Sequence, residues 1–520
     1  MEQGIISQLL NPSVYPDATQ SVNLIQTHIS FLLLTDDYVY KIKKPVDFGF
    51  LNFTTLDRRR FYCEEEVRLN RRLCPDVYLG VVQIRDSANG ATFLGNGEII
   101  EYAVKMRRLP EDRMLEKLLK EDKVEDSDIR RIAAVIAEFH KNAERSAEID
   151  RFGDISVISR NWAENFRQVS DFMCVTINRR DFDIIENWVL SFISRNRDLF
   201  EERVRGGFIR DCDGDIHAEN ICLEDGIHIF DCIEFNERFR YIDTAADIAF
   251  LLMDFDYHGR KAFSGIFVEE YRSLTRDTDM IRILDFYKIY RAFVRGKVES
   301  FKLGDANMTP DEKKTAGEKA ERHFRLARGY VLRAKLEPAV IMFSGLMGSG
   351  KSTLASELAF ELGLDLARSD VVRKQLAGIP PAERRLDEYG GGIYSPDFSG
   401  KTYESLLKTA ETAITSGHGI IIDASFRKRS DRGAFRMLAQ KYGVPFYIVN
   451  TSCPEELIKQ RLKSRILDTG EPSDGRLELF YRQKAEFENI SGNEGKCITL
   501  DTSGSIRNNL DEILGIMNLL

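Results

Sequence analysis

The chain has 520 residues, of which 43% are hydrophobic and 30% charged, and its formal net charge is −9. This composition excludes a wholly disordered chain, and the length predicts about two to four domains. The acidic balance disfavours a protein built mainly to bind nucleic acid, and no run of about 18 apolar residues indicates a membrane span. Residues 1–4 lack the basic start and apolar run of a secretory signal, so we expect a cytoplasmic protein.

The first part of the chain is predicted to form two lobes. Residues 30–34 and 38–43 alternate as strands, and a charged helical stretch follows at 56–73. Helical spacing dominates later, for example at 129–140 and 183–193. These patterns predict a strand-rich small lobe over about 1–105 and a helix-rich large lobe over about 106–310.

The strand at 38–43 carries lysines, and one of them is expected to contact nucleotide phosphates. A glutamate on the following helix should anchor that lysine. We favour Lys43 with Glu66, and Lys41 and Glu65 are nearly as good. Residues 102–109 would form the strand and hinge on which adenine stacks.

A set of polar residues in the large lobe has the spacing of a phosphoryl-transfer site. Asp215 and Asn220 follow the pattern D-x-x-x-x-N, and the apolar run 227–230 ends in Asp231. In this arrangement Asp215 would orient the acceptor hydroxyl, while Asn220 and Asp231 would hold Mg²⁺. A polar turn between two strands is the alternative interpretation.

A break near residue 336 separates a second domain. Residues 310–335 read as a charged connecting helix, and Pro338 precedes the abrupt apolar run 339–343. Apolar strand candidates at 339–344, 419–423 and 445–450 then alternate with helical segments. This alternation predicts an α/β domain with a parallel sheet over 336–520.

The first strand of this domain leads into the phosphate-binding pattern G-x-x-x-x-G-K-[ST]. Its glycines allow backbone N–H groups to surround phosphate oxygens at the start of a helix. Lys351 would reach the β- and γ-phosphates, and Ser352 would ligate Mg²⁺. Asp423, at the end of a buried strand, is a second expected Mg²⁺ ligand, with a helix cap as the alternative. The expected nucleotide-binding residues of this loop are Gly345, Leu346, Met347, Gly348, Ser349, Gly350, Lys351, Ser352 and Thr353.

Two further pairs in this domain are candidates for catalysis. Asp370 and Arg373 share a helix face, so a carboxylate beside an arginine could take the proton of an acceptor hydroxyl. A surface ion pair is equally consistent with the spacing. Arg461 and Arg465, four residues apart, could form a cationic lid over the transferred group, and a solvated helix face is the alternative.

These motifs resemble the small P-loop kinases of the polynucleotide kinase, zeta-toxin and gluconate kinase group. The resemblance covers roughly 339–500 and depends on 345–353, 369–373, 423–426 and the two arginines. It implies that Asp370 activates the acceptor hydroxyl. Because this group phosphorylates very different hydroxyls, the resemblance implies a reaction type and no particular substrate.

The first part resembles the aminoglycoside phosphotransferase and choline kinase-like family. More narrowly, the chain looks like bacterial proteins that fuse such a domain to a P-loop ATP-binding domain. The narrow resemblance depends on 27–30, 40–50, 66–73, 231–236 and 241–249. There are two departures: Asp213 replaces the first histidine of the H-G-D-x-H motif, and no G-x-G-x-x-G loop precedes the lysine strand. Aminoglycosides are disfavoured as substrates because no acidic acceptor cluster can be assigned.

The expected fold is therefore an α+β bilobal kinase-like domain over 1–335 followed by an α/β P-loop domain over 336–520. The expected function is ATP- and Mg²⁺-dependent phosphoryl transfer at two sites to hydroxyl groups of small molecules, with no membrane partner and no nucleic-acid partner. Two alternatives remain. The kinase-like half could be a degenerate ATP sensor that regulates the P-loop half, or the P-loop half could be a polynucleotide 5′-hydroxyl kinase.

Overall fold

A computed structural model describes residues 3–49, 51–88, 90–305, 308–380, 383, 391–465 and 477–520. The chain divides into two units, Met1–Ala327 and Arg328–Leu520. The division falls inside the long helix α13 (Pro310–Arg333), the charged connecting helix of the sequence analysis. Among the described residues, no helix is both long and apolar enough to cross a membrane.

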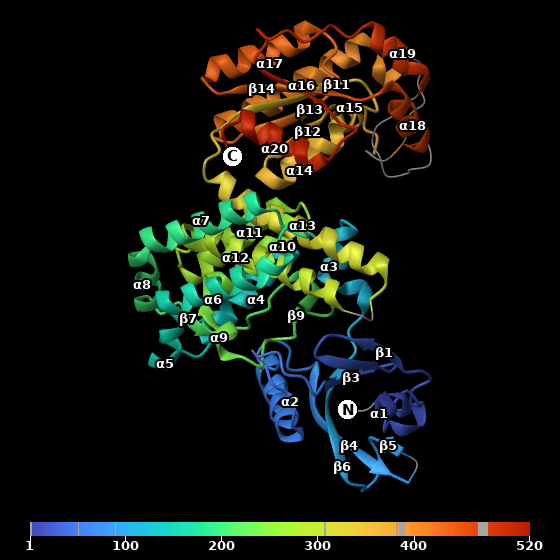
Figure 1. Ribbon diagram of the computed structural model, residues 1–520, viewed down its shortest axis with the longest axis vertical. Coiled ribbons are helices and arrows are strands. Elements are labelled where there is room, and N and C mark those ends of the chain that lie inside the picture. The colour runs from blue at the N-terminus through green and yellow to red at the C-terminus, as the bar shows by residue number, and fades with distance from the viewer. Residues whose placement is uncertain are drawn as a thin grey trace. The chain divides into compact units, whose positions relative to one another are not determined.

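The small lobe of the first unit is built on one antiparallel sheet of six strands (Figure 1). Its order is β1-β2-β3-β6-β4-β5, and helix α2 packs against β4 and β6. Thr55 caps α2 by accepting the Arg58 N–H. The elements are α1 (Gln3–Gln8), β1 (Asn23–Gln26), β2 (Ser30–Leu34), β3 (Tyr38–Lys43), α2 (Leu56–Asn70), β4 (Tyr78–Ser87), β5 (Gly90–Thr92) and β6 (Ile99–Arg107).

The large lobe is mainly helical, as its sequence periodicity predicts. Helix α10 forms its centre and packs on α11 and α12. It is buried on nearly all sides because its sequence is apolar around most of the helix. The helices are α3 (Leu115–Lys120), α4 (Asp126–Asn142), α5 (Ala147–Asp150), α6 (Ile155–Val169), α7 (Arg179–Arg195), α8 (Arg197–Arg205), α9 (Glu237–Arg240), α10 (Thr244–Tyr257), α11 (Lys261–Thr275) and α12 (Ile281–Phe301).

Two short antiparallel strand pairs shape the loops between these helices. Strand β7 (Ile209–Asp211) pairs with β10 (Tyr241–Asp243), and β8 (Ile221–Cys222) pairs with β9 (His228–Ile229). Residues 212–220 and 230–236 therefore emerge side by side from the two pairs. The polar residues predicted to carry the chemistry lie on these two loops.

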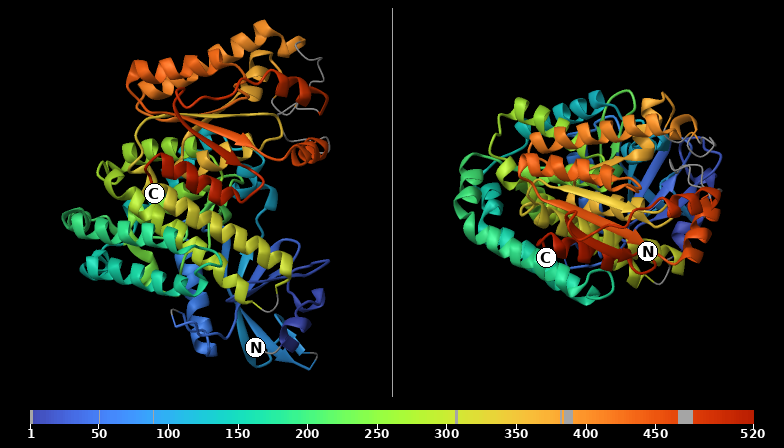
Figure 2. Two further views of the ribbon diagram at one scale, coloured as in Figure 1. Left: turned by 45° about the horizontal axis from the view of Figure 1, so that its top comes forward. Right: turned by 90° about the horizontal axis from the view of Figure 1, so that it is seen from above.

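The second unit contains a parallel five-stranded sheet of order β12-β13-β11-β14-β15. Helices cover both faces (Figure 2): α16 and α17 pack on one face with Met342, Ile422 and Ile448, while α14 packs against β11, β12 and α20. The elements are β11 (Val340–Gly345), α14 (Lys351–Leu362), β12 (Asp365–Arg368), α15 (Ser369–Leu376), α16 (Pro396–Thr415), β13 (Ile420–Asp423), α17 (Arg429–Tyr442), β14 (Phe446–Ser452), α18 (Glu455–Arg465), α19 (Leu477–Ala485), β15 (Lys496–Asp501) and α20 (Ile506–Ile516).

Candidate functional site

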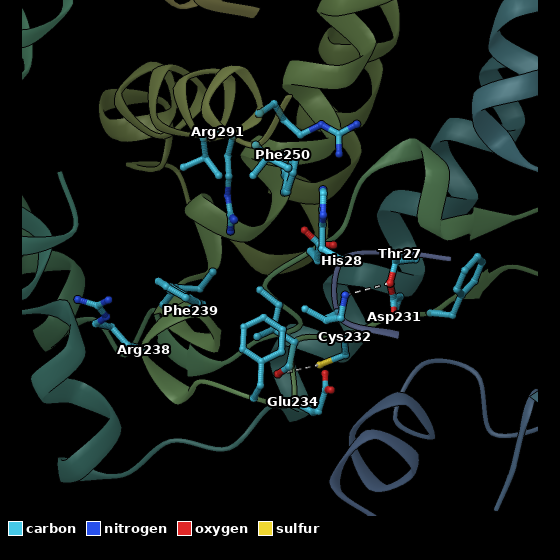
Figure 3. Close-up of a pocket in the computed structure, with 18 of the residues that line it drawn as sticks. Thr27, His28, Asp231, Cys232, Glu234, Arg238, Phe239, Phe250 and Arg291 are labelled. Carbon is cyan, nitrogen blue, oxygen red and sulfur yellow. Dashed lines mark hydrogen bonds between the residues drawn. The ribbon is translucent and has the colours of Figure 1, made fainter. Parts of the chain in front are cut away.

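A cavity of about 1140 Å³ lies in the first unit, with walls from both lobes. Figure 3 shows residues that line this cavity: Asp231 and Glu234 from the loop 230–236, and Thr27 and His28 from the turn between β1 and β2. That turn is tight, because the Thr27 hydroxyl accepts the Ser30 N–H at 2.9 Å. It occupies the position before the lysine strand where the sequence lacks a glycine-rich loop.

The lysine strand delivers two ammonium groups to a single buried glutamate. Lys41 Nζ lies 2.9 Å from Glu66 Oε1, and Lys43 Nζ lies 2.7 Å from Glu66 Oε2. Both lysines reach it because residues two apart on a strand share a face. Burial raises the pKa of Glu66, but the two ammonium charges outweigh it and lower this pKa to about 2. The alternative with Glu65 is wrong, since Glu65 pairs with Arg68 on the helix surface.

The two lysines differ in what else they contact. Lys41 lines the cavity and lies 2.5 Å from Asp231 Oδ1, the expected Mg²⁺ ligand. Lys43 is 1% exposed and forms a second ion pair with Glu234. The preferred pair of Lys43 with Glu66 is thus present, while Lys41 is the lysine that faces the cavity.

Asp215 and Asn220 lie together, as their spacing predicts. Asn220 Nδ2 donates to the carbonyl oxygen of Asp215 at 3.1 Å and to its Oδ2 at 3.2 Å. Burial raises the pKa of Asp215, but the charges of His217, Arg295 and Arg291 outweigh it and lower the pKa. Asp215 is therefore a carboxylate at neutral pH and can accept a proton.

Asp231 lies in the same cavity, two residues beyond the end of β9. Its backbone is in the left-handed region at φ 66°, and its N–H donates to the Tyr78 hydroxyl at 3.2 Å. This conformation departs from the predicted end of an apolar strand. The turn places the Asp231 carboxylate beside Lys41.

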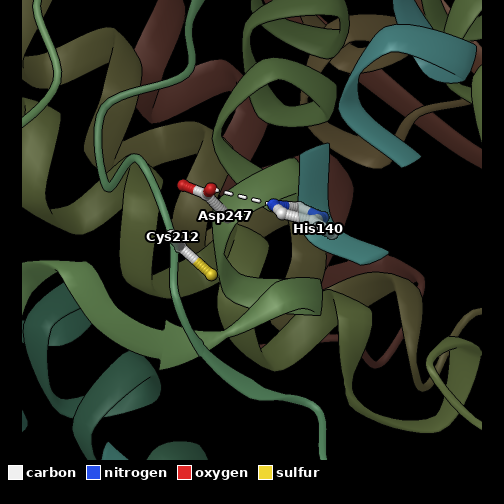
Figure 4. A group of neighbouring side chains, drawn as sticks. All are labelled: His140, Cys212 and Asp247. Carbon is white, nitrogen blue, oxygen red and sulfur yellow. Dashed lines mark hydrogen bonds and ion pairs between the residues drawn. The ribbon is translucent and has the colours of Figure 1, made fainter. Parts of the chain in front are cut away.

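The buried Asp247 braces the loop that carries Asp215. It accepts the backbone N–H groups of Asp213 at 3.1 Å and Gly214 at 2.9 Å, and His140 Nε2 lies 3.0 Å away (Figure 4). The other nitrogen of His140 lies 2.7 Å from the Tyr271 hydroxyl. Residues His140, Cys212 and Asp247 are close enough to hold a metal ion. Because both imidazole nitrogens and the carboxylate already have protein partners, we interpret the group as a brace.

Asp213, which departs from the resembled motif, is also part of this brace. Its Oδ1 accepts the Asp215 N–H at 3.1 Å. Burial, followed by the negative charge of Asp247, raises the pKa of Asp213 to about 8. Asp213 therefore supports the loop that carries Asp215 through a carboxyl group that is largely protonated at neutral pH.

The second unit has its own phosphate-binding geometry between β11 and α14. Gly348 and Gly350 adopt left-handed φ values of 76° and 84°, which side chains disfavour. Ser349 Oγ lies 2.7 Å from Thr451 Oγ1, and Lys351 Nζ donates to the Leu346 carbonyl at 3.2 Å. The loop is thus held in a curled form at the start of a helix.

Asp423 lies at the carboxyl end of β13 and is buried beside this loop. Burial, with a contribution from the charge of Asp370, raises its pKa, and Lys351, a hydrogen bond from Ser352 and the charge of Arg368 oppose the rise. The structure therefore brings together four of the predicted residues: Lys351, Ser352, Asp423 and Asp370. Arg373 lies 3.6 Å from Asp370 Oδ1 on α15, as the spacing predicts.

Arg461 lies against the phosphate loop. Its guanidinium donates to the Gly348 carbonyl at 3.4 Å, and to Thr502 Oγ1 at 3.1 Å and the Thr502 carbonyl at 2.8 Å. In this arrangement Arg461 supports the loop. The side chain of Arg465 lies outside the described residues, so the predicted lid of two arginines stays a prediction.

Comparison with known proteins finds relatives that match most of the length of this chain. Residues 340–490 match the model of an AAA domain. The uncharacterized protein Rv2004c of Mycobacterium tuberculosis is 30% identical over 459 residues, which cover 88% of each chain, and Mb2027c of Mycobacterium bovis matches equally. The chain belongs to the family of these mycobacterial proteins. Because 459 residues exceed either unit, the family match includes residues of both units.

Solved structures similar to part of the chain include three kinases. A sugar kinase from Janibacter is 23% identical, with 35% of this chain and 96% of that chain covered and a TM-score of 0.27. A gluconokinase from Sinorhizobium meliloti is 21% identical, with 35% and 92% covered and a TM-score of 0.26. The APS kinase CysC of Mycobacterium tuberculosis, in complex with AMPPNP and APS, is 16% identical, with 35% and 98% covered and a TM-score of 0.27.

Several residues that hold the two candidate sites together are not predicted from the sequence. Thr502 donates to the Ser349 carbonyl at 2.7 Å, and Gln483 Oε1 accepts the Met347 N–H at 2.7 Å. In the first unit, Asn70 Oδ1 accepts the Cys232 N–H at 2.9 Å and so holds the loop that carries Asp231. A lone threonine, glutamine or asparagine far along the chain gives no sequence signal for such contacts.

Proposed function

We propose that each unit binds Mg-ATP and transfers its γ-phosphoryl group to a hydroxyl group of a small molecule. The observation that carries this proposal is the position of Lys41, whose ammonium contacts both Glu66 and Asp231 at the wall of a cavity that also contains Asp215. The match of residues 340–490 to an AAA domain, together with the phosphate loop, supports ATP binding by the second unit.

The chain's own residues supply complementary roles in the first unit. Lys41 is the cation that can meet the nucleotide phosphates, since Glu66 holds it at the cavity wall. Asp215, a carboxylate at neutral pH, is placed to accept the proton of the acceptor hydroxyl. Asn220 keeps Asp215 in position through two hydrogen bonds.

In the second unit, backbone N–H groups would contact the phosphates more than side chains do. The curled phosphate loop presents N–H groups at the start of α14, and Lys351 adds a positive charge. Asp370 would take the acceptor proton, with Arg373 beside it. The sheet places these groups at one edge, because the carboxyl ends of parallel strands meet there.

Both sites offer the oxygen donors that Mg²⁺ prefers. Asn220 and Asp231 would hold the ion in the first unit, and Ser352 and Asp423 in the second. When bound, Mg²⁺ neutralises charge on the phosphates during transfer. The hydrogen bond from Ser352 to Asp423 keeps the second donor set together. In the first unit, the Phe230 N–H donates to the Asn220 carbonyl at 3.1 Å and so holds Asn220 beside the loop of Asp231.

Calorimetric titration of the full chain with AMPPNP and Mg²⁺ tests the proposal. We expect two sites per chain, one removed by Lys41→Met and the other by Lys351→Ala. Asp231→Asn, which keeps the buried lysine, should weaken the same site as Lys41→Met. Lys408→Ala, at an exposed position of α16, is the matched control and should leave both sites intact.

A single site abolished by Lys351→Ala would contradict the proposal for the first unit. Two sites with no phosphoryl transfer by the first unit would favour the regulatory alternative. Full ATP turnover by a Lys351→Ala, Asp215→Asn double variant would contradict catalysis at both sites. Labelling of DNA or RNA 5′-hydroxyl ends at low salt would replace the small-molecule acceptor of the second unit by a nucleic acid.

A further inference from the structure

One wall of the first-unit cavity is cationic. It is formed by α12, from which Arg291, Arg295 and Lys297 all line the cavity. Arg291 and Arg295 lie near Asp215, since their charges lower its pKa. Lys297 lies about 9 Å farther along the helix than Arg291, at a rise of ~1.5 Å per residue.

Lys297 has only uncharged hydrogen-bond partners among the described residues. Its Nζ donates to Asn165 Oδ1 at 2.6 Å and to Gln168 Oε1 at 2.9 Å. The acidic group whose charge reaches it is Glu164, and Arg238 already holds Glu164 through two hydrogen bonds of 2.9 and 2.7 Å. The ammonium of Lys297 therefore lines the cavity without a counterion of its own.

Two buried polar atoms beside this lysine have no hydrogen-bond partner in the described structure. They are Trp162 Nε1 and Asn161 Oδ1, both on α6, and both residues line the cavity. Trp162 is 1% exposed. Because surrounding side chains shield both atoms, a ligand in the cavity does not reach them, and the ammonium of Lys297 is the charge that it can meet at this end.

We propose that this end of the cavity binds an anionic group, phosphate or carboxylate, of the acceptor, with Lys297 as its charge partner. The acceptor of the first unit is then a hydroxyl-bearing anion whose hydroxyl reaches Asp215 while its charge meets Lys297. A cationic group is disfavoured at this end of the cavity, since the ammonium of Lys297 has no carboxylate partner there. This inference rests on the phosphoryl transfer proposed above for the first unit.

The titration of Lys297 predicts a specific pH dependence for anion binding at this site. Burial lowers its pKa to about 8; the positive charge of Arg238 acts in the same direction, and the negative charge of Glu164 opposes it. The lysine is therefore charged at pH 7 and neutral well above pH 8. An anion that binds through it should bind more weakly as the pH rises, whereas an arginine at this position would stay charged.

The chain has two tryptophans, so Trp188→Phe leaves Trp162 as the sole fluorescent reporter in the cavity. We would titrate this full-length variant with glucose 6-phosphate, glucose and glucosamine, which share a ring and differ in charge. Glucose 6-phosphate is expected to bind at least tenfold more tightly than the other two. Its affinity should fall at least tenfold from pH 7 to 9.5.

Three further variants complete the test in the same background. Lys297→Met should weaken glucose 6-phosphate at least tenfold at pH 7, and Lys297→Arg should restore binding and keep it at pH 9.5. Lys141→Met, at an exposed position of α4, is the control and should change nothing. Absence of glucose 6-phosphate binding, equal binding of glucose or glucosamine, or an unchanged affinity in Lys297→Met would overturn the proposal.

The same samples separate this inference from the proposed function. Lys297→Met should bind AMPPNP and Mg²⁺ as the parent does, because the hydrogen-bond partners of Lys297 are Asn165 and Gln168 on α6 and include neither Lys41 nor Asp231. If glucose 6-phosphate binds through Lys297 while AMPPNP does not bind the first unit, the phosphotransferase proposal fails and the anion site stands. If AMPPNP binds there and the anion does not, only the present inference fails.

Discussion

The buried carboxyl of Asp213 should make the stability of the first unit depend on pH. An aspartate in an unfolded chain ionises near pH ~4, whereas burial and the charge of Asp247 raise the pKa of Asp213 to about 8 in the folded chain. Between these values the folded state holds a proton that the unfolded state has lost. The free energy of unfolding therefore falls as the pH rises through this window.

The size of this change in the free energy of unfolding follows from the titration of a single proton. Each pH unit inside the window costs about 1.4 kcal/mol, so the loss between pH ~5 and 8 amounts to at most about 4 kcal/mol. Asp213→Asn removes the ionisation but keeps an oxygen that can accept the Asp215 N–H. The variant should therefore be more stable than the parent, by a margin that grows as the pH rises from 5 to 8.

Urea unfolding followed by tryptophan fluorescence measures this margin. Both tryptophans, Trp162 and Trp188, lie in the first unit, so the signal reports that unit within the full chain. Asp171→Asn, at an exposed position, serves as the control and should show no growing margin. A margin for Asp213→Asn that stays constant with pH, or a variant less stable than the parent at pH 8, would refute the reasoning.

Two other predictions concern the two candidate sites. In a Lys351→Ala background, Asp215→Asn should lower the rate of phosphoryl transfer by the first unit about 100-fold or more, while AMPPNP binding is retained. An unchanged rate would exclude Asp215 as the proton acceptor. Gly350→Ala should weaken AMPPNP at the second site about tenfold, since the residue has φ 84° and its Cβ would lie 3.0 Å from Thr502 Oγ1. Gly433→Ala, in α17 with no atom within 4 Å of the added carbon, should leave calorimetric affinity unchanged, and equal effects of the two substitutions would contradict this account.

Local patterns were sufficient to predict the elements that position both sites. The alternation of residues 38–43 predicts β3, and the sequence of strand, glycine loop and helix predicts β11 and α14, which the structure confirms. The edge strand β15 was not predicted, because Lys496–Asp501 is mostly exposed and has little apolar signal. Thr502, which supports the phosphate loop, follows this strand and was missed with it.

Contacts between distant segments could not be predicted in the same way. Alternation places Lys41 and Lys43 on one face of β3, and it gives no reason to choose between them. The choice depends on a loop 190 residues farther along the chain, where Asp231 contacts Lys41 and Glu234 contacts Lys43. Likewise, Lys297 lies in a helix of mixed charge, and only the packing of α12 against α6 makes its face a cavity wall.

Under the proposed function, the two units would bring positive charge to phosphate by different physical means, and this determines which substitutions are informative. In the first unit the cations and carboxylates at the cavity are side chains, so single changes of charge at Lys41 or Asp215 should remove one role while the loop keeps its brace through Asp247. In the second unit much of the positive potential comes from backbone N–H groups, which no side-chain substitution removes. In the second unit, an informative substitution is therefore one that disturbs the left-handed backbone conformation of Gly348 or Gly350. A substitution at Gly350 that leaves the affinity for AMPPNP intact would therefore argue against phosphate binding by this loop. By contrast, substitutions of the brace residues Asp213 and Asp247 that do not change this affinity would leave the assignment of the first site to Lys41 and Asp231 unchanged.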